Sequence, residues 1–143
     1  MSRASRLRGR ADRDERGVAA VEFAIVLPLL ILLVFGIVEF SVAYNRQQGL
    51  HAAAREGARV AALPQTTAGD IDTRVRSALS GVLSPSEITA ATVTVTPSGS
   101  QPCNAAPRGT HVVVTVAVPD QLSIPMFKNQ SLTLTGRGEF LCE

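Results

Sequence analysis

One apolar run limits what this chain can fold into. From Phe23 to Val38 the sequence "FAIVLPLLILLVFGIV" has 16 residues and no charge. A signal-peptide core has about 10 to 14 apolar residues, and a complete span has about 18 or more. A helix over residues 18–43 would reach about 39 Å at about 1.5 Å per residue, enough to cross the hydrocarbon core. We therefore expect a transmembrane segment at residues 18–43, with about 100 residues left for a small fold.

The excess positive charge lies on one side of this segment. Residues 1–17 carry six arginines and three acidic residues, whereas the rest of the chain has eight basic and nine acidic residues. The positive-inside rule then predicts a cytoplasmic leader at residues 1–17 and an exported C-terminal part. Nucleic-acid binding is disfavoured, because three acids are mixed with the arginines, no aromatic residue accompanies them and a membrane segment follows within a few residues.

Glu22 is the unusual residue at the start of the span, because an unpaired carboxylate in hydrocarbon costs a few kcal/mol. Three interpretations compete. The segment is a secretory signal cleaved before Tyr44, or an uncleaved signal anchor in which Glu22 reaches toward water. In the third, cleavage after Gly17 makes Val18 the first residue. Its new α-amino group then gives Glu22 a cationic partner in the same or a neighbouring chain.

The stretch "RGVAAVEFAIVLPLLILLVFGIVEF" resembles the processing site of type IV prepilins through Gly17, Val18, Glu22 and Phe23. Together with "AAAREGARVAA" farther on, residues 16 to about 63 resemble the TadE-like minor pilins, or pseudopilins, of the tight adherence (Tad) pilus system. The resemblance implies that a prepilin peptidase cuts between Gly17 and Val18, and that Glu22 serves processing and assembly.

The same resemblance implies a structural or assembly role in a Tad-type pilus. The partners it implies are the prepilin peptidase, other minor or major pilins and the inner-membrane assembly platform. It places the chain in the inner membrane as a single-pass protein. An alternative stays open, in which the chain is a signal-anchored envelope binding or structural domain with no connection to pili.

Residues 44–63 predict that the helix continues beyond the membrane. This stretch is rich in Ala, and the first residue that stops a helix is Pro64. Small residues recur at every fourth position: Gly49, Ala53, Gly57 and Ala61. Such a stripe lets another backbone approach closely. It packs either against helices of neighbouring chains or against a sheet of its own chain.

Residues 64–143 predict a small exported α+β domain. Apolar periodicity indicates a short helix at 70–83 with Asp70 as its N-cap. Alternating Val and Thr residues predict three strands, at 92–96, 110–118 and 131–135. Gly136 and Gly138 suggest a bulge or bend in the last strand. We expect the order α-α-β-β-β, with a three-stranded antiparallel sheet that a helix covers.

The two cysteines predict a disulfide. Cys103 and Cys142 both follow the span, on the side where an oxidising compartment lets a disulfide persist. Closing a loop of about 40 residues would stabilise the fold by about 4 kcal/mol. The cysteines lack metal-ligand spacing, and neither His51 nor His111 is accompanied by a catalytic motif. We therefore expect no metal, no other cofactor, no small-molecule substrate and no enzymatic activity.

Overall fold

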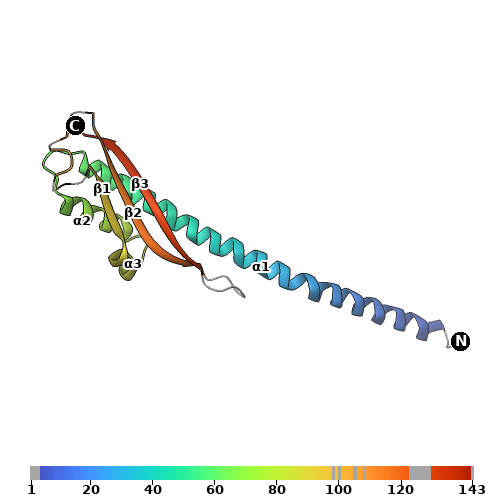
Figure 1. Cartoon of the computed structure of the whole chain (residues 1–143). Coiled ribbons are helices and arrows are strands. Elements are labelled where there is room, and N and C mark those ends of the chain that lie inside the picture. Colours follow the sequence, from blue (N-terminus) through green and yellow to red (C-terminus); the bar gives the residue numbers. More distant parts are fainter. Residues whose placement is uncertain are drawn as a thin grey trace. The chain divides into compact units, whose positions relative to one another are not determined.

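The computed structural model describes residues 4–97, 99, 101–104, 106–107, 109–122 and 130–142. It contains a long N-terminal helix, shorter helices and a three-stranded antiparallel sheet, so the predicted fold class is confirmed (Figure 1). The chain divides into two compact units, Met1–Val38 and Glu39–Glu143. Helix α1 (Ala4–Ala61) has residues in both units.

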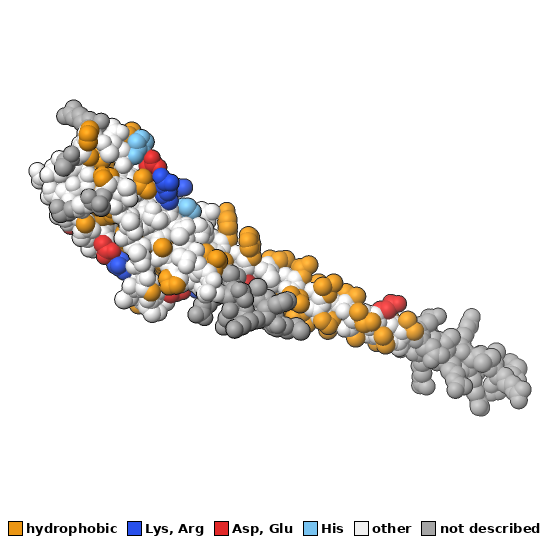
Figure 2. Space-filling model, viewed as in Figure 1, with side chains coloured by type: hydrophobic (Ala, Val, Ile, Leu, Met, Phe, Trp, Pro, Cys, Tyr) orange, Lys and Arg blue, Asp and Glu red, His pale blue; other side chains and the backbone are white. Residues whose placement is uncertain are grey.

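The first unit is a helix with exposed apolar side chains. Nearly every side chain described from Gly17 to Val38 is exposed, including Leu29 at 70% and Ile25 at 73%. The helical stretch Gly17–Ala61 contains a window of mean hydropathy 2.8, none of which is buried. Figure 2 shows this surface as a run of hydrophobic side chains along α1. By length and composition, the helix is able to cross a membrane.

The second unit is built on a sheet with strand order β1-β2-β3. Its remaining elements are α2 (Ala68–Leu79), α3 (Pro85–Ala90), β1 (Thr92–Thr96), β2 (His111–Leu122) and β3 (Gln130–Leu141). Both strand pairs are antiparallel. In β2, every second side chain from Val112 to Val118 is buried, as the alternation of an antiparallel sheet with one covered face requires. The core continues into Leu50 of α1 and Ile71 of α2.

Helix α2 begins earlier than predicted. Thr67 is its N-cap: the Thr67 hydroxyl oxygen accepts a hydrogen bond from the Asp70 amide at 3.2 Å. The Asp70 carboxylate in turn accepts from the Thr67 amide at 3.0 Å. The prediction of Asp70 as N-cap is therefore wrong, because its side chain closes a capping box from the third helical position. The helix ends at Leu79 rather than at Leu83.

Helix α3 is an element that the predicted order α-α-β-β-β lacks. Ser84 is the N-cap, Pro85 begins the helix, and the Ser84 amide donates to the Glu87 carboxylate at 2.8 Å. The sequence "SPSE" contains this signal, since a serine followed three residues later by a glutamate is a capping box and proline favours the first helical position.

Gly136 and Gly138 do not form a bulge. The pairing of β2 with β3 continues through Val116↔Gly136 and Val114↔Gly138 without interruption. A Cβ atom at Gly136 would overlap the backbone carbonyl of Leu50, and one at Gly138 would overlap that of Ala54. These glycines are thus required because the backbones of β3 and α1 lie in direct contact.

Candidate functional site

The residues of the predicted processing site lie together on the exposed surface of α1. Val18 is 59% exposed and Phe23 60% exposed, and Gly17 and Glu22 are also exposed. A Cβ atom at Gly17 would meet nothing within 4 Å. The ion pairs found among the described residues all lie in the second unit, and Glu22 takes part in none of them. Its carboxylate is therefore presented on an otherwise apolar helix surface.

The small-residue stripe lies against the chain's own domain. A Cβ atom added to Gly49 would lie 2.7 Å from a methyl group of Val82, and one added to Gly57 would lie 2.5 Å from a methyl group of Val75. Ala53 and Ala61 are 1% and 0% exposed. These small residues thus bring α1 close to other elements of its own chain, and packing of the stripe against helices of neighbouring chains stays a prediction.

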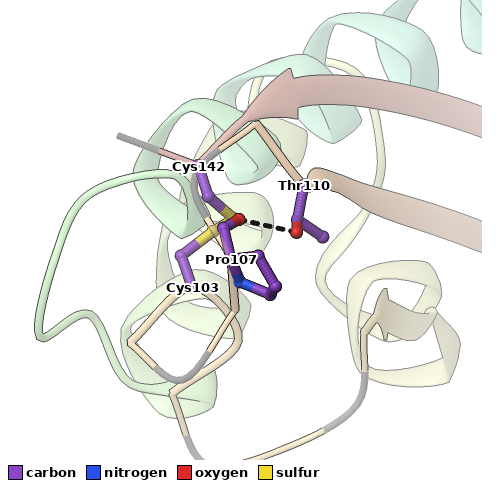
Figure 3. Close-up of a disulfide and its surroundings, with 4 residues drawn as sticks. All are labelled: Cys103, Pro107, Thr110 and Cys142. Atoms are coloured by element: carbon purple, nitrogen blue, oxygen red, sulfur yellow. Dashed lines mark hydrogen bonds between the residues drawn. A yellow bond between two sulfur atoms is a disulfide. The ribbon is translucent and has the colours of Figure 1, made fainter.

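Cys103 and Cys142 form the predicted disulfide, with their Cα atoms 5.4 Å apart (Figure 3). The loop beside it is ordered by hydrogen bonds. The Thr110 amide and hydroxyl donate to the Pro107 carbonyl at 3.0 and 2.7 Å, and the Cys142 amide donates to the Thr110 carbonyl at 2.9 Å. Gly109 permits the turn before Thr110 through its φ of 84°. The disulfide thus joins the loop before β2 to the end of β3.

Arg46 joins three elements of the domain and was missed by the sequence analysis. Its guanidinium lies 2.8 Å from the Asp120 carboxylate of β2 and 3.1 Å from the Glu87 carboxylate of α3. The side chain of Asp120 is only 11% exposed, so this pair is shielded from water more than an ordinary surface pair. No local pattern around Arg46 reveals a partner that lies 74 residues away.

Gln47 and His51 are a second missed pair, and they contact the backbone of the edge strand β3. The Gln47 amide donates to the Thr135 carbonyl at 2.6 Å, and the Arg137 amide donates to the His51 Nδ1 at 3.2 Å. They lie one helical turn apart on α1. Because unpaired groups on an edge strand invite pairing with other chains, these contacts protect the middle of β3.

The titratable groups of the domain serve its local structure. Hydrogen bonds from Ser84 lower the pKa of Glu87, and the charge of Arg46 adds to this effect. Hydrogen bonds from Thr67 lower the pKa of Asp70 in the same way. His111 lies 2.7 Å from Glu139 on the exposed end of the sheet. Among the described residues, no group of three metal-ligating side chains comes together.

These features define a class of protein: an apolar N-terminal helix able to span a membrane, continuing into a disulfide-containing α+β domain. The family model described as TadE-like protein matches the chain at residues 17–59, which confirms the predicted resemblance. The match associates the chain with the Tad pilus system and fits a membrane-anchored protein. No curated protein and no solved structure matches the chain.

Proposed function

We propose that this chain is a minor pilin or pseudopilin that a prepilin peptidase cleaves between Gly17 and Val18. The observation that carries the proposal is that the TadE-like match begins at Gly17, which is the last residue of the charged leader. Gly17 lies within α1, so the peptidase would need to open the helix locally. Glycine has a low helix propensity, which lowers the cost of that opening.

In this proposal, cleavage provides Glu22 with its partner. The new α-amino group at Val18 is a cation at the membrane boundary, where an isolated carboxylate is costly. Glu22 of a neighbouring chain neutralises it as the helices pack side by side. The exposed apolar surface of residues 18–38 supports such packing, because nothing in the chain's described part covers it.

The proposed arrangement is a single-pass protein of the inner membrane with a cytoplasmic leader and an exported domain. The arginines of the leader support this orientation. The disulfide supports export of the second unit, because such bonds persist in oxidising compartments. The proposed partners are the peptidase, other pilins and the assembly platform. The role is structural, with no enzymatic activity and no cofactor.

The test is the N-terminal sequence and intact mass of the chain from native membranes, with and without the candidate peptidase. We expect a chain that begins at Val18 and reverts to full length without the peptidase. A chain that keeps its leader in all strains would support a plain signal anchor, and one beginning at Tyr44 a secreted domain.

A second experiment compares the incorporation of two variants into the pilus. We expect Glu22→Ala to block incorporation, whereas the matched variant Glu39→Ala, at the other end of the apolar run, leaves it intact.

A further inference from the structure

Within the second unit, the hairpin formed by β2 and β3 runs along α1 (Figure 1). Gly138 lies against Ala54, and Gly136 lies against Leu50. Decreasing residue number in β3 therefore follows decreasing residue number in α1. At about 3.3 Å per residue, the four residues from Gly136 to Leu132 cover about 13 Å, which equals about nine helical residues. Leu132 thus lies near the level of Val42.

One contact and one exposure pattern support this level. Leu132 is the cross-strand partner of Asp120, and Asp120 is paired with Arg46 of α1 at 2.8 Å. On α1, Ala43 is partly covered, whereas Val42 and Tyr44 are exposed on either side of it. The distal part of the hairpin, residues 119–122 and 130–133, therefore lies beside the segment of α1 that follows Glu39.

This level coincides with the expected edge of the bilayer. Glu39 ends the uncharged run, and the headgroup region of one leaflet is about 5 to 8 Å thick, or about three to five helical residues. Phe40 and Tyr44 are 69% and 57% exposed, and their rings stack with centroids 6.3 Å apart. Exposed aromatic side chains at the end of a span are typical of the membrane interface. Leu132, 43% exposed, presents a further large apolar side chain at that depth.

We propose that the distal part of the hairpin contacts the lipid headgroup region, with Leu132 inserted among the lipids beside α1. The exposed side chains of Phe40, Val42 and Leu132 provide apolar surface directly after the uncharged run, and lipid is the partner that surrounds such a span. The pairing of Asp120 with Arg46 lowers the cost of bringing its charge toward the bilayer. The proposal rests on the membrane anchoring in the proposed function and adds a second lipid contact.

The test uses the absence of tryptophan from the chain, which makes any introduced tryptophan a unique reporter. The full chain is reconstituted in phosphatidylcholine vesicles, with and without lipid brominated near the headgroup. Leu132→Trp reports on the hairpin. Val42→Trp is the control for the anchor, and Thr94→Trp, on the exposed side of β1, is the control away from the membrane. We expect brominated lipid to quench Leu132→Trp and Val42→Trp but not Thr94→Trp.

Each other pattern overturns a specific statement. If Val42→Trp is quenched and Leu132→Trp behaves like Thr94→Trp, the hairpin contact is wrong and the anchor stands. If none of the three is quenched, the anchor itself fails. If quenching of Leu132→Trp disappears as protein is added to the same lipid, while that of Val42→Trp persists, a second copy of the chain covers this surface and lipid is not its partner.

Two further variants protect the test against misfolding. Thr133 is adjacent to Leu132 and exposed, so a large side chain is tolerated there. Thr133→Trp should therefore show the same quenching by bromine near the headgroup. Arg46→Gln in the Leu132→Trp chain removes the charge that holds Asp120. We expect it to reduce the quenching of Leu132→Trp without changing that of Val42→Trp measured in the same Arg46→Gln background. Unchanged quenching in both would show that Arg46 does not hold the hairpin at the bilayer.

Discussion

The two parts of helix α1 differ in how their side chains are buried. In residues 18–38 the large apolar side chains are exposed, and Leu30 is 51% exposed. In residues 49–62 most of the small residues are buried, and Ala54 and Ala58 are 0% exposed. The part that packs on protein is thus built from Ala and Gly, which allow a strand to approach the helix backbone. The exposed part, which is long and apolar enough to cross a membrane, presents large apolar side chains and makes no such close approach. The two parts therefore differ in residue size as well as in hydropathy.

The largest expected effect comes from a matched pair of leucines, one in each part. Leu50 is 0% exposed in the domain core, so Leu50→Ala should cost about 2–5 kcal/mol of domain stability. Leu30→Ala should leave domain stability unchanged, because Leu30 belongs to the first unit and has no place in the core of the second. Hydrogen exchange of the β2 amides in the detergent-solubilised chain measures both. Equal loss of protection in the two variants would break the distinction between the two parts of the helix.

The disulfide should act on the second unit alone. Cys103 and Cys142 are 39 residues apart, and in the chain-entropy model closing such a loop contributes about 4 kcal/mol. Replacing both by Ser should therefore accelerate exchange throughout β2 and β3, whereas the amides of residues 24–38 keep their protection in detergent. A double variant with wild-type exchange in the sheet would show that the bond adds nothing to this fold.

Glycines provide a finer comparison between the two units. An added methyl group would overlap the α1 backbone at Gly136 in the second unit, but it would meet no atom within 4 Å at Gly36 in the first unit. Gly136→Ala places a Cβ atom onto the Leu50 carbonyl, and because that is backbone it cannot rotate away. We expect a loss of about 3 kcal/mol in domain stability, at the upper end of overpacking effects. The control is Gly36→Ala in the exposed apolar part of α1, where a Cβ atom would meet nothing within 4 Å. Thermal unfolding that is equal in the two variants would contradict the close approach of β3 and α1.

The sequence was sufficient to predict the elements whose patterns are local. The apolar run, the Ala-rich extension and the alternation of Val112 to Val118 each follow from short-range periodicity. The pairing of Cys103 with Cys142 was predictable because the chain has only two cysteines. The resemblance to TadE-like proteins was likewise contained in a continuous stretch, residues 17–59.

What the sequence did not reveal depends on contacts between distant residues. Gly136 and Gly138 interrupt a strand pattern, and a bulge is the usual local explanation for such glycines. Their real cause is the backbone of α1, far earlier in the chain, as the contact of His51 with Arg137 at a separation of 86 illustrates. The two uses of the small-residue stripe could not be separated for the same reason. An Ala-rich face looks identical whether its partner is a sheet or another helix.

The smallest expected effect is a pH dependence confined to the second unit. Hydrogen bonds from Ser84 hold the pKa of Glu87 below its ordinary value of 4.5, so the folded state binds this proton less readily than the unfolded state does. The stabilisation is therefore complete above the unfolded pKa and is lost as the pH falls through the folded pKa.

Lowering the pH from about 6 to about 3 should lower the melting temperature of the domain, and Glu87→Gln should make that decline shallower. Gly81→Ala, where an added Cβ atom would meet nothing within 4 Å, is the control and should keep the wild-type slope. If Glu87→Gln leaves the slope unchanged while Asp70→Asn reduces it, the acid sensitivity resides at the start of α2, whose carboxylate has a pKa lowered by Thr67. A decline of equal size in the helicity of residues 18–38 would remove the contrast, since in that part of the described helix no capping box holds a carboxylate.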